Sequence, residues 1–99
     1  MPYEKIRELE KKIEGLRSEP ESPELIAALN DIGLTCIHSD PEQSEAYALE
    51  AYELASKLGI PEEQARSNLT RAVFHLEAGN FDDALSQCSH AMDIYQRLD

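Results

Sequence analysis

The chain has 99 residues, and its 20 acidic against nine basic side chains give a formal net charge of −11. This length provides one domain and leaves little room for both a hydrophobic core and an enlarged active-site cleft. The negative charge repels nucleic acid phosphates and anionic membrane surfaces, so we expect neither a nucleic acid nor a membrane as a partner. Only four Gly and five Pro are present, and β-branched residues are scarce beside Ala, Leu, Glu, Gln and Lys, which predicts an all-α fold.

Compartment and redox state are predicted from two further features. The sequence has no apolar run of about 18 residues, and its start lacks the apolar stretch and cleavage site of a secretory signal. We therefore expect a cytoplasmic protein. Cys36 and Cys88 lie far apart among apolar helical neighbours, which predicts reduced core thiols and no disulfide.

The first predicted element is an amphipathic helix over about residues 3–18, within an N-terminal segment of residues 1–20 that also holds five of the nine basic residues. Spacings of three and four residues define its apolar seam, which consists of Ile6, Leu9, Ile13 and Leu16. The alternation of Ile and Leu suits a parallel two-stranded coiled coil, although two heptads fall short of the usual three or four. The seam is therefore a candidate for homodimerisation.

A linker with two prolines separates this helix from the next. Each proline fixes φ and lacks an amide donor, so the segment 18–23 ends the first helix. Ser22 is the predicted N-cap and Pro23 belongs to the first turn of the second helix. That helix is expected to continue to Ile37, and because it is apolar on nearly every side it must be covered on more than one face.

Three further helices are predicted, over about residues 41–58, 61–78 and 81–97. Asp40 is the expected N-cap of the first of them and Gly59 its left-handed C-cap. Gly79 and Asn80 suit a tight bend between antiparallel helices. The last helix is predicted to bury one apolar side, formed by Phe81, Ala84, Leu85, Cys88, Ala91, Met92, Ile94, Tyr95 and Leu98.

The predicted helices repeat in pairs. A shift of 40 residues superposes helices 41–58 and 81–97, so that Ala51 falls on Ala91, and a shift of 39 superposes the helices before them, so that Gly33 falls on Ala72. Self-similarity at such a period indicates stacked helical hairpins. We therefore predict that residues 21–99 contain two copies of a helix pair.

Residues 23–98 resemble the tetratricopeptide repeat, which has a small residue midway in its first helix, a turn with Gly and an aromatic residue, and small residues in its second helix. In the second pair these positions are held by Ala72, Gly79-Asn80-Phe81, Ala84, Cys88 and Ala91. The first pair has Gly33, Ser44, Ala48 and Ala51, but its turn lacks the glycine and the aromatic residue. The resemblance implies an α-solenoid of antiparallel helical hairpins with about five helices. Small residues would let the helix axes approach closely, while Phe81 and Tyr47 would fill gaps between neighbours.

The tail Lys57-Leu58-Gly59 is similar to repeats in the tetratricopeptide segments of bacterial signalling enzymes. This resemblance implies a scaffold in the regulatory or sensory region of a larger signalling protein, not an enzyme. Two repeats are fewer than the three that a stable stack usually needs. We therefore expect that the chain is a piece of a longer protein or that a second copy covers the last repeat, with the first helix supplying further cover.

In the tetratricopeptide family the first helix of each pair lines a concave surface. The positions that the resemblance implies here form a mostly apolar groove, made of Ala27, Asn30, Leu34, Ile37, Arg66, Leu69, Val73 and Leu76. Such a groove suits an amphipathic helix, from another protein, from a second subunit or from the N-terminus of the same chain, with Asn30 and Arg66 providing orientation. At each position, packing between neighbouring helices remains an alternative.

No catalytic residue, cofactor site or metal site is predicted. Zinc requires four convergent ligands, and the two Cys-x-His pairs, which begin at Cys36 and Cys88, place their side chains on different faces of a helix. The acidic pairs at 62–63 and 82–83 lie at helix starts, where the helix dipole favours them. The sequence thus favours a protein-binding module. The alternatives are a structural dimerisation segment and, less favoured, a metal-binding or catalytic helical bundle.

Overall fold

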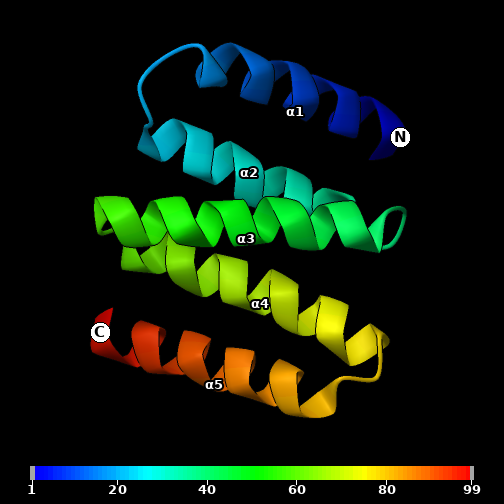
Figure 1. Ribbon diagram of the computed structural model, residues 1–99, viewed down its shortest axis with the longest axis vertical. Coiled ribbons are helices and arrows are strands. Elements are labelled where there is room, and N and C mark those ends of the chain that lie inside the picture. Colours follow the sequence, from blue (N-terminus) through cyan, green and yellow to red (C-terminus); the bar gives the residue numbers. More distant parts are fainter. Residues whose placement is uncertain (1, 99) are drawn as a thin grey trace.

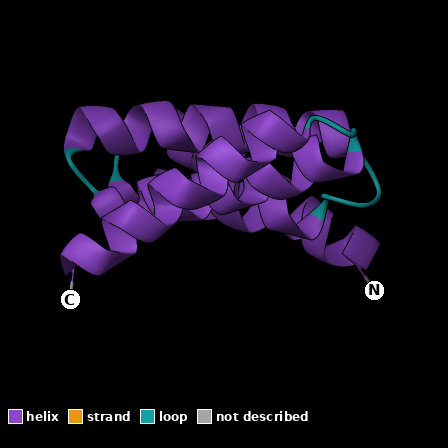
Figure 2. Cartoon of the chain, turned by 90° about the horizontal axis from the view of Figure 1, so that it is seen from below, coloured by secondary structure: helices purple, strands orange, loops and turns teal. Residues whose placement is uncertain are grey.

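The computed structural model describes residues 2–98 and is all-helical. Its five helices are α1 (Pro2–Arg17), α2 (Pro23–Thr35), α3 (Pro41–Leu58), α4 (Pro61–Glu77) and α5 (Phe81–Leu98). Consecutive helices pack against one another in chain order, so that α1 and α5 form the two ends of a row (Figure 1). When the row is viewed along its length from below, the N-terminal end of α1 and the C-terminal end of α5 lie at opposite sides (Figure 2). The predicted all-α fold is therefore confirmed, and the described residues contain no strand.

The helices begin and end at the predicted local signals. The hydroxyl of Ser22 accepts a hydrogen bond from the amide of Leu25, and the carboxylate of Asp40 caps α3 in the same way, both at 3.3 Å. Gly59 adopts the left-handed conformation with φ +71° at the end of α3, as expected. One boundary was wrong, because α2 ends at Thr35 and the chain turns before Ile37, whose side chain is buried.

The main hydrophobic core lies among α1, α2 and α3. Its buried members are Leu9, Ile13, Leu25, Ile26, Ala28, Leu29, Ile32, Ala51 and Ala55. Leu9 and Ile13 of the predicted dimer seam belong to this core, and the other two seam residues, Ile6 and Leu16, pack against it. The seam is therefore used inside the chain. Pairing with a second copy through it stays a prediction, and it requires α1 to leave this position.

The α1 helix does not fill the predicted groove, because it packs on α2 at the opposite end of the row from α5 (Figure 1). Arg17 at its C-terminus bonds to the carboxylate of Glu50 on α3, with Nη2 and Oε1 separated by 2.8 Å. This hydrogen bond raises the pKa of Arg17 despite partial burial. The contact ties the end of α1 to the first helix pair.

Small residues permit close helix contacts, as the sequence predicted. A Cβ on Gly33 would lie 3.4 Å from the carbonyl oxygen of Ser44 and 3.7 Å from Cγ2 of Thr70. The hydroxyl of Ser44 also donates a hydrogen bond to the carbonyl of Gly33. Tyr47 packs against the core, but Phe81 fills no gap between helices because it is 65% exposed.

The prediction for the apolar side of α5 was largely wrong. Only Ala84, Ala91 and Ile94 are buried, and Cys88 is half-buried. Leu85 is 67% exposed and Met92 60%, while Tyr95 and Leu98 are also exposed. The physical reason is that α5 ends the row, so α4 covers one of its faces and no described helix covers the next.

Candidate binding groove

Two adjoining hollows lie on one apolar surface of α2, α4 and α5. The α4–α5 groove, of about 350 Å³, is lined by Leu69, Ala72, Val73, Leu76, Phe81, Ala84, Leu85 and Cys88. The α2–α4 hollow, of about 250 Å³, is lined by Asn30, Leu34, Arg66, Leu69, Thr70 and Val73. Leu69 and Val73 belong to both, so the two hollows meet at these two side chains.

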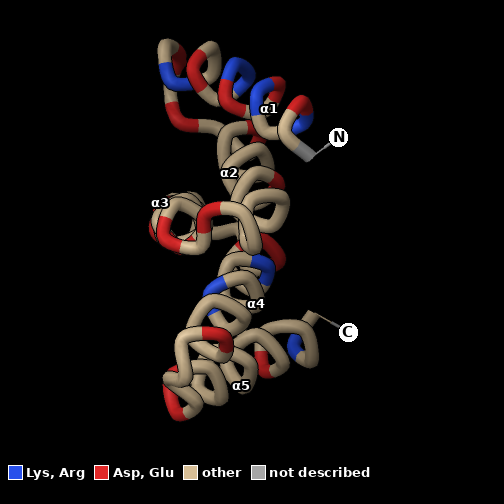
Figure 3. Tube along the Cα trace, turned by 90° about the vertical axis from the view of Figure 1, so that its right-hand side faces the viewer, with Lys and Arg blue, Asp and Glu red and all other residues tan. Residues whose placement is uncertain are grey.

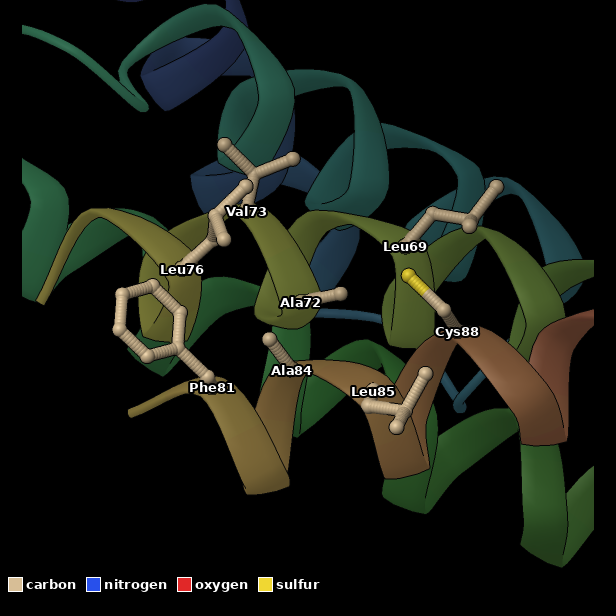
Figure 4. A pocket seen from close by; sticks show the side chains of 8 residues that line it. All are labelled: Leu69, Ala72, Val73, Leu76, Phe81, Ala84, Leu85 and Cys88. Carbon is tan, nitrogen blue, oxygen red and sulfur yellow. The ribbon is translucent and has the colours of Figure 1, made fainter. Parts of the chain in front are cut away.

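The α4–α5 groove has a floor of small side chains between taller walls (Figure 4). Ala72 of α4 and Ala84 of α5 face one another across the middle of the groove. Phe81 lies at one end, near the N-terminus of α5, and Leu85 and Cys88 lie towards the other end. The small floor residues leave space that the larger side chains surround.

The structure brings together most of the predicted groove. Asn30, Leu34, Arg66, Leu69 and Val73 line the α2–α4 hollow, and Leu76 lines the α4–α5 groove. Two predicted positions lie outside both hollows: Ala27 is half-buried, and Ile37 is buried because the chain turns at the end of α2.

Sequence reasoning missed the contribution of α5 to this surface. Phe81, Leu85 and Cys88 were assigned to a buried side, but they line the groove instead. One signal could have found them. These residues follow one another at spacings of four and three, which defines one helical stripe, and each of the other four predicted helices has its own position in the two pairs or before them.

Asn30 is nearly fully buried and uses its polar groups within the chain. Its Nδ2 donates to the carbonyl oxygen of Glu63 at 3.1 Å and to the Glu63 carboxylate at 2.8 Å, while its Oδ1 accepts from the hydroxyl of Ser67 at 2.9 Å. Asn30 therefore holds α2 and α4 in register. A role of Asn30 in orienting a partner stays a prediction, beside the structural role that these bonds give it.

Arg66 is also paired inside the chain. Its guanidinium lies 2.8 Å from Asp31 and 3.1 Å from Glu63. Burial opposes its charge, but the hydrogen bond to Asp31 and the charge of Glu63 outweigh this effect and raise the pKa of Arg66. Arg66 stays protonated, and its positive charge is more than balanced by the carboxylates of Asp31 and Glu63 at the edge of the hollow.

One end of the α4–α5 groove is acidic. Phe81 also lines a hollow with Asp82 and Asp83 in the first turn of α5, and Glu77 at the end of α4 is exposed. Glu77 lies 3.3 Å from Nδ1 of His38, which is itself exposed. Basic residues instead gather in α1, at the far end of the row (Figure 3).

The two cysteines differ in their surroundings. Cys36 is buried, and this burial raises the pKa of its thiol, whereas the sulfur of Cys88 lies in the groove (Figure 4). His90 contacts the ring of Tyr52, with ring centroids 6.2 Å apart, so it faces away from Cys88. Among residues 2–98, no three His, Cys, Asp or Glu side chains are placed to hold a metal ion.

Comparisons of the chain with protein-family models, curated proteins and solved structures found no match. The resemblance to the tetratricopeptide repeat therefore stays a prediction from the residue pattern. In the described part of the chain, no helix has the length and apolar character required to cross a membrane.

Proposed function

We propose that this chain is a protein-binding module that holds a helix or peptide of another protein on the surface formed by the α2–α4 hollow and the α4–α5 groove. The observation that supports this proposal is that the two hollows adjoin one another at Leu69 and Val73. The surface exposes several large apolar side chains, namely Leu34, Leu69, Leu76, Phe81 and Leu85. Contiguous exposed apolar surface on a small protein marks an interaction site.

The chemistry of the lining supports a binding role over a catalytic one. The two hollows contain two titratable side chains, Arg66 and Cys88, and Arg66 is already paired with Asp31 and Glu63. General acid–base catalysis requires positioned groups that exchange protons near the working pH. On the residue resemblance alone, we place the module in the regulatory or sensory part of a larger cytoplasmic signalling protein.

A display library of random 16-residue peptides tests the proposal. Peptides selected on the immobilised protein are synthesised, and their dissociation constants are measured by fluorescence polarisation. Leu69→Glu places a charge where both hollows meet, so we expect selected peptides to bind this variant at least about tenfold more weakly. Leu49→Glu is the matched control, because Leu49 is 36% exposed against 39% for Leu69 and lines neither hollow.

Far-UV circular dichroism of both variants shows whether they keep the helical fold. Failure of the library to enrich any peptide, or equal affinity of the selected peptides for the two variants, would refute the proposed function.

Self-association is the second candidate, because an apolar stripe continues along α5 past the groove through Met92 and Tyr95. The net charge of −11 makes two copies repel one another, which favours a different partner. Light scattering distinguishes the candidates. A dimeric wild type that becomes monomeric on Leu85→Glu would assign the surface to contacts between copies.

A further inference from the structure

The α4 helix packs on a surface of the first helix pair, and the equivalent positions of the second pair form a similar surface. Three residues of the first pair contact or closely approach α4. Asn30 bonds to Glu63 and Ser67, Gly33 lies beneath Thr70, and Glu45 accepts a hydrogen bond from Arg71 at 3.2 Å. These residues define the seat of α4.

The shifts of 39 and 40 residues identify the equivalents of Asn30, Gly33 and Glu45 in the second pair as Leu69, Ala72 and Leu85. All three equivalents line the α4–α5 groove. We call the groove surface formed by these three equivalents the second seat. The 17-residue α4 covers the first seat, whereas no helix within residues 2–98 covers the second seat.

We infer that the α4–α5 groove is a seat for one helix, and that its occupant is a basic amphipathic helix of a partner protein. This inference rests on the proposed function and deepens it. By equivalence with α4, which runs parallel to α2, the occupant runs parallel to α4 and antiparallel to α5.

The side chains of the second seat also predict which side chains the occupant presents to it. Between the two pairs, Asn30 is replaced by Leu69, Ser44 by Ala84 and Glu45 by Leu85, so a polar seat becomes an apolar one. The α4 helix meets its seat with polar side chains, including Ser67 and Arg71. The occupant of the second seat instead presents small and aliphatic side chains, because a polar group buried there would find no hydrogen-bond partner.

Charge at the end of the seat predicts where the occupant is basic. In the parallel orientation, its C-terminus lies near the start of α5, beside Asp82 and Asp83. A helix C-terminus already favours Lys and Arg through its dipole, and the two aspartates add to this preference.

The test uses two synthetic 16-residue peptides of identical composition with blocked ends. Both carry Leu and Ala at spacings of three and four, with Gln and Ser elsewhere. One has three lysines in its last turn and the other has them in its first turn. We expect the protein to bind the first peptide at least about tenfold tighter, as measured by fluorescence polarisation.

The variant Asp82→Asn/Asp83→Asn distinguishes the effect of the two aspartates on binding from the effect of lysine position on the helicity of the free peptides. Moving lysines to the first turn weakens the peptide helix by itself, but this effect is the same for both proteins. We therefore expect the ratio of the two dissociation constants to be at least about threefold smaller on the variant than on the wild type. A difference that persists unchanged would overturn the assigned direction and charge of the occupant.

Two single variants locate the bound peptide. Leu85→Glu changes the α4–α5 groove alone and is expected to weaken binding at least about tenfold, while Leu34→Glu changes only the α2–α4 hollow and is expected to cost less than about threefold. Protection of Cys88 from alkylation gives a second readout, because its sulfur lies in the groove. Circular dichroism checks that both variants fold.

Three results would overturn the seat. If Leu34→Glu abolishes binding and Leu85→Glu does not, the ligand lies in the α2–α4 hollow, and the proposed function survives without the seat. If neither peptide binds while library peptides bind and depend on Leu69, the inference again fails alone. If light scattering shows that a second copy of the chain occupies the groove, the partner helix is excluded.

Discussion

Replacing Asn30 by alanine tests whether hydrogen bonds hold the two helix pairs in register. The change removes two neutral hydrogen bonds, to the Glu63 carbonyl and the Ser67 hydroxyl, and one to the Glu63 carboxylate. With about 0.5–1.5 kcal/mol for each neutral bond and about 1.5–3 kcal/mol for the charged one, the sum is about 2.5–6 kcal/mol. Ser67 keeps a bond to the Glu63 carbonyl and Glu63 keeps its pairing with Arg66. No partner is left without a bond, so we expect the low end of this range, a fall of about 2.5–3 kcal/mol in the free energy of unfolding.

Urea unfolding followed by circular dichroism at 222 nm measures this loss. A double-mutant cycle with Ser67→Ala isolates the bond between the two side chains, and its expected coupling is about 0.5–1.5 kcal/mol. A loss below about 1 kcal/mol for Asn30→Ala, or the absence of coupling, would show that apolar packing holds the pairs without help from this network.

Four further predictions concern stability and reactivity. Asn68 is buried, and its Nδ2 has no hydrogen-bond partner among the described residues. Asn68→Leu should therefore raise the free energy of unfolding, measured in urea, by about 1–2 kcal/mol. A decrease would contradict this prediction. Gly33→Val should lower the free energy of unfolding by about 1–3 kcal/mol, because a Cβ already lies 3.4 Å from the Ser44 carbonyl oxygen and two further methyl groups would crowd α3 and α4. The control Gly33→Ala adds the Cβ alone and should stay within about 1 kcal/mol of the wild type. Iodoacetamide should alkylate Cys88 at least about tenfold faster than Cys36, as measured by peptide mass spectrometry, and equal rates would contradict the burial of Cys36. Because the folded state raises the pKa of Cys36 above its usual 9.0, the unfolded chain releases this proton first, so the free energy of unfolding should fall as pH rises above 9.0, and less so in Cys36→Ala.

Helix positions could be predicted from the sequence because their signals are local. Ser22 and Asp40 cap the helices that follow them, and Gly59 takes the left-handed conformation that other residues rarely adopt. Each signal acts within one turn of chain, so neighbours in sequence suffice to interpret it. The end of α2 was less predictable, because Ile37 continues the apolar pattern although the chain has already turned there.

The roles of single groove residues depend on distant parts of the chain and could not be predicted in the same way. Asn30 lies at a groove position by periodicity, but its bonds reach residues more than 30 positions away. Phe81 and Leu85 have the apolar character of core residues, and they are exposed because no helix within residues 2–98 covers them. An apolar pattern identifies the face of a helix that avoids water, but it does not identify what covers that face.

Equivalent positions of the two seats carry polar side chains in the first seat and apolar side chains in the second. This difference suits the first seat to a permanent contact with α4 and the second to a reversible contact with a partner. Asn30 and Glu45 make directional polar contacts with α4, so a shifted α4 would leave buried groups without partners. The short turn at Gly59 also keeps α4 at a high effective concentration beside its seat. At Leu69 and Leu85 the contacts are apolar and non-directional, so helices of different sequence can bind with similar free energy, and charge at one end sets their direction. If the proposed function holds, the same repeat geometry therefore has two uses. In the first pair it holds α4 within the fold, and in the second pair its apolar residues bind the helix of a partner.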